Sequence, residues 1–287
     1  MISRREFSLG ALASAAVMGA PRVNSVINGV AIGAQTYSFR DRSVDDCIAA
    51  MKEIGLGYTE LWSGHVEPKY DFRKEGGREE IRNWRLSPEA LKKAAEVKKK
   101  FNDAGIELHA YNYSFRDDFT DAEIERGFEI AKALGVKKIT ASSNVSTARR
   151  VDPFASKAKI FCGMHNHSRI VPNEFATPED FTAAMDGMSK YICVNLDIGH
   201  FWAANFNPVD YLTQHHDRIV TLHIKDRRKN QGPNMVFGEG DTPIKEVLQT
   251  LKKNKWKIPA MIEYEYKGAD TVAEVKRCFE YCKQALA

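Results

Sequence analysis

Ionisable side chains recur at the ends of short apolar segments along this chain. His165, Asp197, His223 and Glu263 each stand at or beside the end of such a segment. Imidazole and carboxylate groups together form the ligand set of a divalent metal of intermediate hardness. If the four segments are successive strands of one sheet, their side chains can converge on one point. We therefore predict one divalent metal ion (Mn, Co, Zn, Fe, Ni or Mg) held by these four residues.

Each of the four residues also has a purely structural explanation. A single histidine at a strand end is more often a hydrogen-bonding group than a ligand, and Asp197 could cap the loop that follows it. Glu263 could form an ion pair with Lys225 or Lys267. Such explanations suffice for any one residue, but four of them on four successive strands would be a large coincidence.

A metal that binds a carbonyl and its neighbouring hydroxyl polarises both groups and makes the proton on the adjacent carbon removable. Glu263 could be both ligand and base, Lys225 could stabilise the resulting enediolate or act as an acid, and Glu60 could orient a ligand or a sugar hydroxyl. Return of the proton gives isomerisation or epimerisation, whereas loss of a β-substituent gives elimination. Lys225 could equally be a surface or ion-paired lysine, and Glu60 could belong to an internal ion pair.

Further polar and aromatic residues near the segment ends could bind a substrate. His167 shares a face with His165, because every second side chain of a strand points the same way. Histidines can bind sugar hydroxyls and aromatic rings can stack on a sugar, although structural roles and core packing are the commoner explanations. The predicted substrate-binding residues are His109, His167, His200, Trp62 and Glu239, the last of which could also be only a turn residue.

The elements that must position these residues alternate between two kinds. Short β-branched or apolar segments are followed by longer segments that carry apolar residues at helical spacing. This alternation, which carries no hairpin signal, predicts parallel strands joined by right-handed crossovers. The expected strands are residues 30–37, 58–62, 107–113, 138–142, 159–165, 192–197, 219–224 and 260–265.

Eight such units in about 260 residues match the α/β class and a (β/α)8 TIM barrel, in which active sites lie at the carboxyl ends of the strands. An open doubly wound sheet would usually carry a glycine-rich first turn, which is absent after residues 30–37. We expect residues 21–287 to form a single barrel domain. Its helices are expected at residues 43–54, 87–102, 121–134 and 271–286, with others starting near Thr177, Asn207 and Thr242, and one shortened helix at 151–157 after strand four.

Several of these segments resemble the xylose isomerase-like TIM barrel superfamily. Its members include sugar-phosphate isomerases/epimerases, ketose 3-epimerases, inosose dehydratases and endonuclease-IV-type enzymes. The matching pieces are Tyr58-Thr59-Glu60-Leu61-Trp62, Asp197-Ile198-Gly199-His200, His223-Ile224-Lys225-Asp226, Gly238-Glu239-Gly240-Asp241 and Ile262-Glu263-Tyr264-Glu265.

For the epimerase-like branch, the resemblance implies one divalent metal held by Glu, Asp, His and Glu from strands five to eight. Asp197, His223 and Glu263 match the last three ligands, and His165 stands where the family has its first glutamate. This replacement lowers the negative charge of the site. It also removes one of the two glutamates that ketose epimerases use as acid and base, which argues against a simple two-carboxylate epimerisation.

The first twenty residues predict an export signal. Arg4 and Arg5 precede a short apolar stretch from Leu9 to Ala20, and Pro21 follows. A charged start, an apolar middle and a small-residue end are typical of a secretory signal, and the paired arginines resemble a twin-arginine signal. We expect a signal peptide at residues 1–20 and a periplasmic location; the alternative is an ordinary amphipathic helix. The stretch is too short for a stable membrane span.

Composition narrows the class of protein further. Lys and Arg number 42 against 38 Asp and Glu, a balance too mild to indicate nucleic acid. An endonuclease-IV-like enzyme would also need a three-metal cluster with more ligands. Since export argues against a metabolic sugar phosphate, we expect a metal-dependent isomerase or epimerase acting on an unphosphorylated sugar or keto-sugar. The alternatives are a keto-glycoside lyase or hydrolase using the same site, and a non-catalytic sugar-binding barrel. A homo-oligomer is left open.

Overall fold

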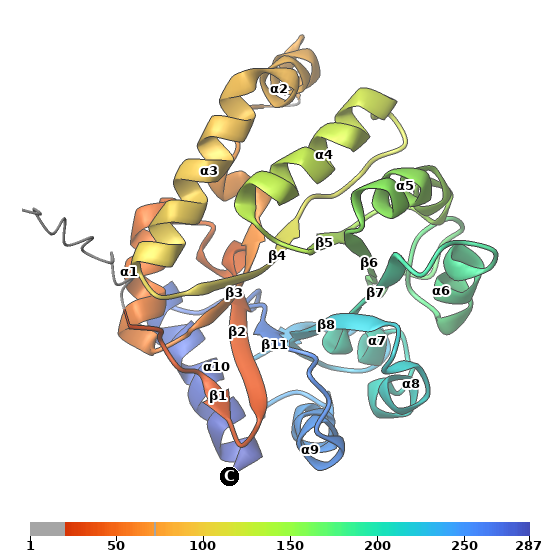
Figure 1. Cartoon of the computed structure of the whole chain (residues 1–287). Helices are drawn as coiled ribbons and strands as arrows, with labels where there is room; N and C mark the ends of the chain where they lie inside the picture. Colours follow the sequence, from red (N-terminus) through yellow and green to blue (C-terminus); the bar gives the residue numbers. More distant parts are fainter. Residues whose placement is uncertain (1–20, 72) are drawn as a thin grey trace, which may run out of the picture.

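Eight parallel strands close into a barrel in the computed structural model, which describes residues 21–71 and 73–287 (Figure 1). The ring closes because β2 pairs with both β3 and β11, the first and last of the other barrel strands. The predicted (β/α)8 TIM barrel is therefore confirmed. Its strands are β2 (Val30–Gln35), β3 (Tyr58–Trp62), β4 (Glu107–Asn112), β5 (Lys138–Ala141), β6 (Phe161–His165), β7 (Ile192–Asp197), β8 (Ile219–Ile224) and β11 (Ala260–Ile262).

Helices surround the ring of strands (Figure 1). Their starts follow local signals: the Ser43 side chain caps α1, and Thr120 and Glu123 form a reciprocal capping box at the start of α4. The helices that follow the barrel strands are α1 (Val44–Ile54), α3 (Pro88–Asp103), α4 (Asp121–Leu134), α5 (Val145–Ala158), α6 (Pro178–Met185), α8 (Pro208–His215), α9 (Ile244–Asn254) and α10 (Thr271–Leu286).

The predicted shortening of the helix after strand four is wrong. Helix α5 has 14 residues and contains Pro153, which made its first half look like a loop in the sequence. A proline is tolerated in the first turns of a helix but disrupts the interior. Here the residues on both sides of Pro153 remain helical, so the helix is of ordinary length.

Several small elements were not predicted from the sequence. Two antiparallel pairs contradict the expected absence of hairpins, and the turn Asn28-Gly29 was the missed signal for the first. The additional elements are β1 (Val26–Ile27), η1 (Thr36–Phe39), η2 (Ser63–His65), α2 (Gly77–Leu86), α7 (Ile198–Ala203), β9 (Asp226–Arg227) and β10 (Asn234–Met235).

The barrel strands are buried on both faces, as expected for a parallel sheet covered by helices. Gly33 is needed where β2 passes closest to its neighbour, because a Cβ there would lie 2.4 Å from the Tyr58 carbonyl oxygen. Within the described residues, no helix combines the length and the apolarity that crossing a membrane requires. The predicted signal at residues 1–20 lies outside the described part of the chain.

Candidate metal centre

The four predicted metal ligands lie together at the carboxyl end of the barrel. His165 ends β6, Asp197 ends β7, His223 lies in β8 and Glu263 directly follows β11. One ligand atom from each residue falls within 4.8 Å of the others, and all four residues are buried. Four parallel strands that end on the same rim account for this convergence.

His223 lies between two carboxylates. Its Nδ1 is 3.1 Å from Glu263 Oε2, and its Nε2 is 2.9 Å from Glu60 Oε1. Burial alone would lower the pKa of His223, but Glu60 and Glu263 raise it well above its ordinary value. In a metal-bound protein, Nδ1 would face the ion and Nε2–H would donate to Glu60. A carboxylate in that outer position fixes the tautomer and the orientation of a ligating histidine.

Glu60 is itself held in place by two neutral donors. Gln35 Nε2 and Thr140 Oγ1 donate to Glu60 Oε1 at 3.0 and 2.7 Å. The side chain is completely buried in β3. The structure therefore places Glu60 beside the cluster, in contact with His223, rather than on the cavity wall.

Lys225 brings a cation into the same cluster. Its Nζ lies 3.1 Å from Asp197 Oδ2, 2.9 Å from Glu263 Oε2 and 2.6 Å from Glu265 Oε2. Burial disfavours the charge, but Asp197, Glu263 and Glu265 outweigh it and raise the pKa of Lys225. Against the opposite effect of burial, Lys225 and then His223 hold the pKa of Glu263 well below its usual range. His200 and Lys225 likewise hold the pKa of Asp197 well below its usual range, against the effect of burial. Asp197 and Glu263 are thus both ionised, as metal ligands must be.

Two buried atoms in the cluster form no well-directed hydrogen bond among the described residues, although one of them, Asp197 Oδ2, is ion-paired with Lys225. The second of them is His165 Nε2. The other Asp197 oxygen accepts from the His200 backbone N–H at 2.6 Å. Unsatisfied buried polar atoms are rare in folded proteins. Two of them 3.6 Å apart, beside Glu263 and His223, fit a divalent cation by number and type of donor.

A cavity of about 360 Å³ opens over the cluster. Its walls carry several of the predicted substrate-binding residues, namely His167, His200 and Trp62, and the Trp62 ring meets Tyr37 edge to face at 5.2 Å. The volume suits a monosaccharide-sized ligand. The remaining polar lining comes from Gln35, Asn112, Ser114, Ser142 and Glu265.

Comparison with known proteins identifies the family of this chain. Residues 48–284 match the model of the xylose isomerase-like TIM barrel. The chain belongs to this family. None of the curated proteins matches the chain.

Solved structures of this family's fold resemble the chain over most of its length. A sugar phosphate isomerase/epimerase from Parabacteroides distasonis is 19% identical, with 90% of this chain and 97% of that chain covered and a TM-score of 0.63. The 3-keto-D-glucoside 4-epimerase of E. coli is 14% identical, with 88% and 97% covered and a TM-score of 0.65. A Bacillus anthracis protein titled "probable 3-DHS dehydratase" is 17% identical, with 87% and 97% covered and a TM-score of 0.62. At these identities the likeness shows a shared fold.

The structure separates two predicted substrate-binding residues from the cavity of this family member. His109 Nε2 lies 3.3 Å from the Val220 carbonyl oxygen and 3.0 Å from Lys138 Nζ, at the start of β8 and β5 and thus at the opposite end of the barrel. Glu239 pairs with Arg277 of α10 at 3.0 Å, and both side chains are more than half exposed. Neither residue lines the cavity, so their predicted contact with a substrate is not supported.

Residues that sequence reasoning did not assign also shape this site. Arg227 Nη1 donates to His200 Nδ1 at 2.7 Å and to Ser168 Oγ at 2.8 Å, which fixes the imidazole at the cavity wall. Burial, with Lys225 adding to it, keeps the pKa of His200 well below its usual value. Asn195 Nδ2 lies 3.1 Å from His223 Nε2. Arg227 follows Lys225 by two positions, and Asn195 precedes Asp197 by two. The alternation of side chains along a strand was the available signal for both.

Proposed function

We propose that this protein is a metal-dependent isomerase or epimerase of an unphosphorylated sugar or keto-sugar. The observation that carries the proposal is the group of four buried ligand atoms within 4.8 Å, below a polar cavity of about 360 Å³. We also propose that the protein is exported, on the basis of the arginine pair and apolar stretch within residues 1–20.

His165, Asp197, His223 and Glu263 would hold the ion. When bound, a divalent cation acts as a Lewis acid toward a carbonyl and its neighbouring hydroxyl. The chain's own part is to bind the sugar, orient it and move a proton. Trp62 and His167 form the cavity wall around the sugar, and His200, held by Arg227, can bind one of its hydroxyl groups.

Glu263 would accept the proton from the carbon beside the carbonyl. Its lowered pKa keeps it ionised but makes it a weak base while Lys225 lies 2.9 Å away. Negative charge that develops on the substrate oxygen would attract the Lys225 ammonium. As that ammonium turns from Glu263 toward the substrate, the carboxylate becomes more basic at the moment when it takes the proton.

Elimination from a keto-glycoside is the second candidate. It is favoured by His165, which leaves the site without the second ligand glutamate that a two-carboxylate epimerisation would use. Both an epimerase and a protein titled as a dehydratase are among the structures with this fold. A non-catalytic sugar-binding barrel would keep the cavity and lack the proton transfer.

The first experiment is elemental analysis of the purified protein and of matched variants. We expect about one divalent ion per chain in the wild type and its loss in His223→Ala and Glu263→Ala, since each removes one of four ligands. His109→Gln is the control, because it removes a histidine at the other end of the barrel. Absence of metal under every supplementation, or equal loss in the control, would contradict the proposal.

A second experiment separates the reactions. Sugars and keto-glycosides are incubated in D2O and followed by NMR. Exchange of the proton beside the carbonyl with an intact glycosidic bond indicates epimerisation, and release of the aglycone indicates a lyase or hydrolase. Metal binding with neither result favours a sugar-binding barrel.

A further inference from the structure

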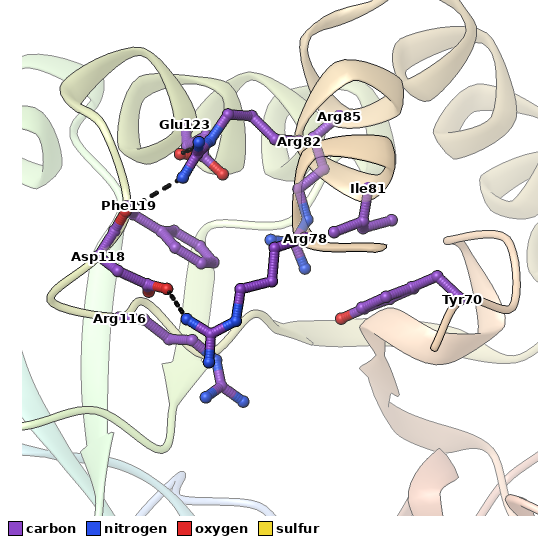
Figure 2. Close-up of a pocket in the computed structure, with 9 residues that line it drawn as sticks. All are labelled: Tyr70, Arg78, Ile81, Arg82, Arg85, Arg116, Asp118, Phe119 and Glu123. Atoms are coloured by element: carbon purple, nitrogen blue, oxygen red, sulfur yellow. Dashed lines mark hydrogen bonds and ion pairs between the residues drawn. The ribbon is translucent and has the colours of Figure 1, made fainter. Parts of the chain in front are cut away.

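A second cavity, lined by four arginines, lies beside the carboxyl ends of β3 and β4. Helix α2 supplies Arg78, Arg82 and Arg85, and the segment between β4 and α4 supplies Arg116 (Figure 2). The cavity measures about 100 Å³, and its wall is completed by Tyr70, Ile81, Asp118, Phe119 and Glu123. This is room for one small group rather than for a sugar.

Two of these arginines have structural roles. Arg85 is buried and donates through Nε and Nη2 to the two oxygens of Glu67 at 2.7 and 3.0 Å. Arg82 Nε lies 2.9 Å from Glu123 Oε2, which ties α2 to the start of α4. Both cations are therefore matched by a carboxylate each.

The other two arginines, Arg78 and Arg116, carry two positive charges and are matched by only one carboxylate. Arg78 pairs with Asp118 at 2.5 Å, and its side chain is 67% exposed. The Arg116 side chain is exposed and has no hydrogen bond or ion pair to the residues that the structure describes. Figure 2 shows Arg78 and Arg116 reaching toward the same part of the cavity from α2 and from the β4–α4 segment. After all pairs are counted, one positive charge remains.

We propose that this cavity is a binding site for one oxyanion, of the size of a phosphate or a carboxylate. Guanidinium groups bind such anions through paired hydrogen bonds of fixed geometry. The buried Arg85–Glu67 pair anchors α2, and the exposed Arg78 and Arg116 side chains would contact the anion. The site is separate from the metal centre and does not depend on the reaction proposed above.

The test is calorimetric titration with inorganic phosphate and, separately, with acetate, at constant ionic strength maintained with sodium chloride. We expect saturable binding of one anion per chain, weakened at least tenfold in Arg78→Gln and in Arg116→Gln. Arg22→Gln is the matched control, because this exposed arginine lies beside the first residue of β4, at the other end of the barrel. It should change the affinity less than twofold. Binding of phosphate alone would assign a free or esterified phosphate, and binding of acetate alone a carboxylate.

Three results would overturn the proposal. The first is equal binding by wild type and Arg116→Gln, with circular dichroism showing both folded. The second is a response that chloride reproduces at the same ionic strength, which would be screening only. The third is loss of phosphate binding in His223→Ala but not in the arginine variants, which would place the anion at the metal centre.

Discussion

At the scale of single residues, the Lys225 ammonium competes for the oxygens that a metal would use. It lies 2.9 Å from Glu263 Oε2 and 3.1 Å from Asp197 Oδ2. Like charges so close in a buried site repel each other strongly. The lysine therefore stabilises the metal-free cluster and weakens the binding of a dication, while its charge remains available to a substrate oxyanion.

We expect Lys225→Met to raise metal affinity at least tenfold and to abolish proton exchange on the substrate. Without metal, the variant should lose about 3–5 kcal/mol of unfolding free energy, because removal of one partner leaves buried carboxylates uncompensated. Competition with a chromophoric chelator measures the affinity. Lys229→Met is the control, because the Lys229 ammonium lies over the Trp202 ring. Metal affinity that stays constant or falls in Lys225→Met would show that the two cations do not compete.

At the scale of elements, α2 depends on one buried ion pair. Arg85 of this helix binds both oxygens of Glu67, and the side chains of both residues are less than a tenth exposed. The Arg85 guanidinium also lies over the Phe119 ring, 4.9 Å from its centroid. The sequence of α2 is Gly-Arg-Glu-Glu-Ile-Arg-Asn-Trp-Arg-Leu. It is so polar that an apolar face does not identify this segment as a helix from the sequence. The contact with Glu67, which precedes α2 in the chain, therefore helps to hold the helix in place.

Arg85→Met should reduce the free energy of unfolding by about 3–5 kcal/mol, because Glu67 keeps its charge without a partner in a buried place. Unfolding in urea, followed by tryptophan fluorescence, measures the change. The matched control is Asp103→Asn, which breaks the exposed pair with Lys99 in α3 and should cost less than about 0.5 kcal/mol. Adding Glu67→Leu to Arg85→Met should restore part of the loss. Equal small effects in Arg85→Met and Asp103→Asn would contradict this role.

At the scale of the whole molecule, the two ends of the barrel carry different ionisable groups. The carboxyl end gathers the four candidate metal ligands, and the amino end holds His109 beside Lys138. Burial, and then Lys138, lower the pKa of His109 to about 3. An unfolded chain would take up a proton on this histidine below about pH 6.5, whereas the folded protein does so only near pH 3. Stability from this group is thus present above pH 6.5 and is lost as the pH falls.

His109→Asn should therefore make the protein less sensitive to acid. Between pH 6.5 and 4, its free energy of unfolding should fall less steeply than that of the wild type, by up to about 1.4 kcal/mol per pH unit. Urea titrations at pH 7.5, 6, 5 and 4 measure the two slopes. The other histidines are the same in both proteins, so the difference isolates His109. Parallel curves would show that His109 is not held neutral in the folded protein.

The sequence by itself determined the barrel and the four residues of the candidate metal centre. Parallel strands that end on one rim must bring their last side chains together, so Asp197 and His223 could be placed without coordinates. The i, i+2 alternation likewise anticipated that His167 shares the face of His165.

Only the tertiary structure decided the rest. In β4 the register shifts between Leu108 and Ala110, so His109 is an extra residue that faces the other end of the barrel. Glu239 forms an ion pair with Arg277 because α10 lies beside the loop that contains Glu239. The arginine cavity likewise joins α2 to a segment about 40 positions away along the chain. Strand spacing can predict which residues share a rim, but bulges, loop paths and contacts between distant segments depend on the packing of the whole chain.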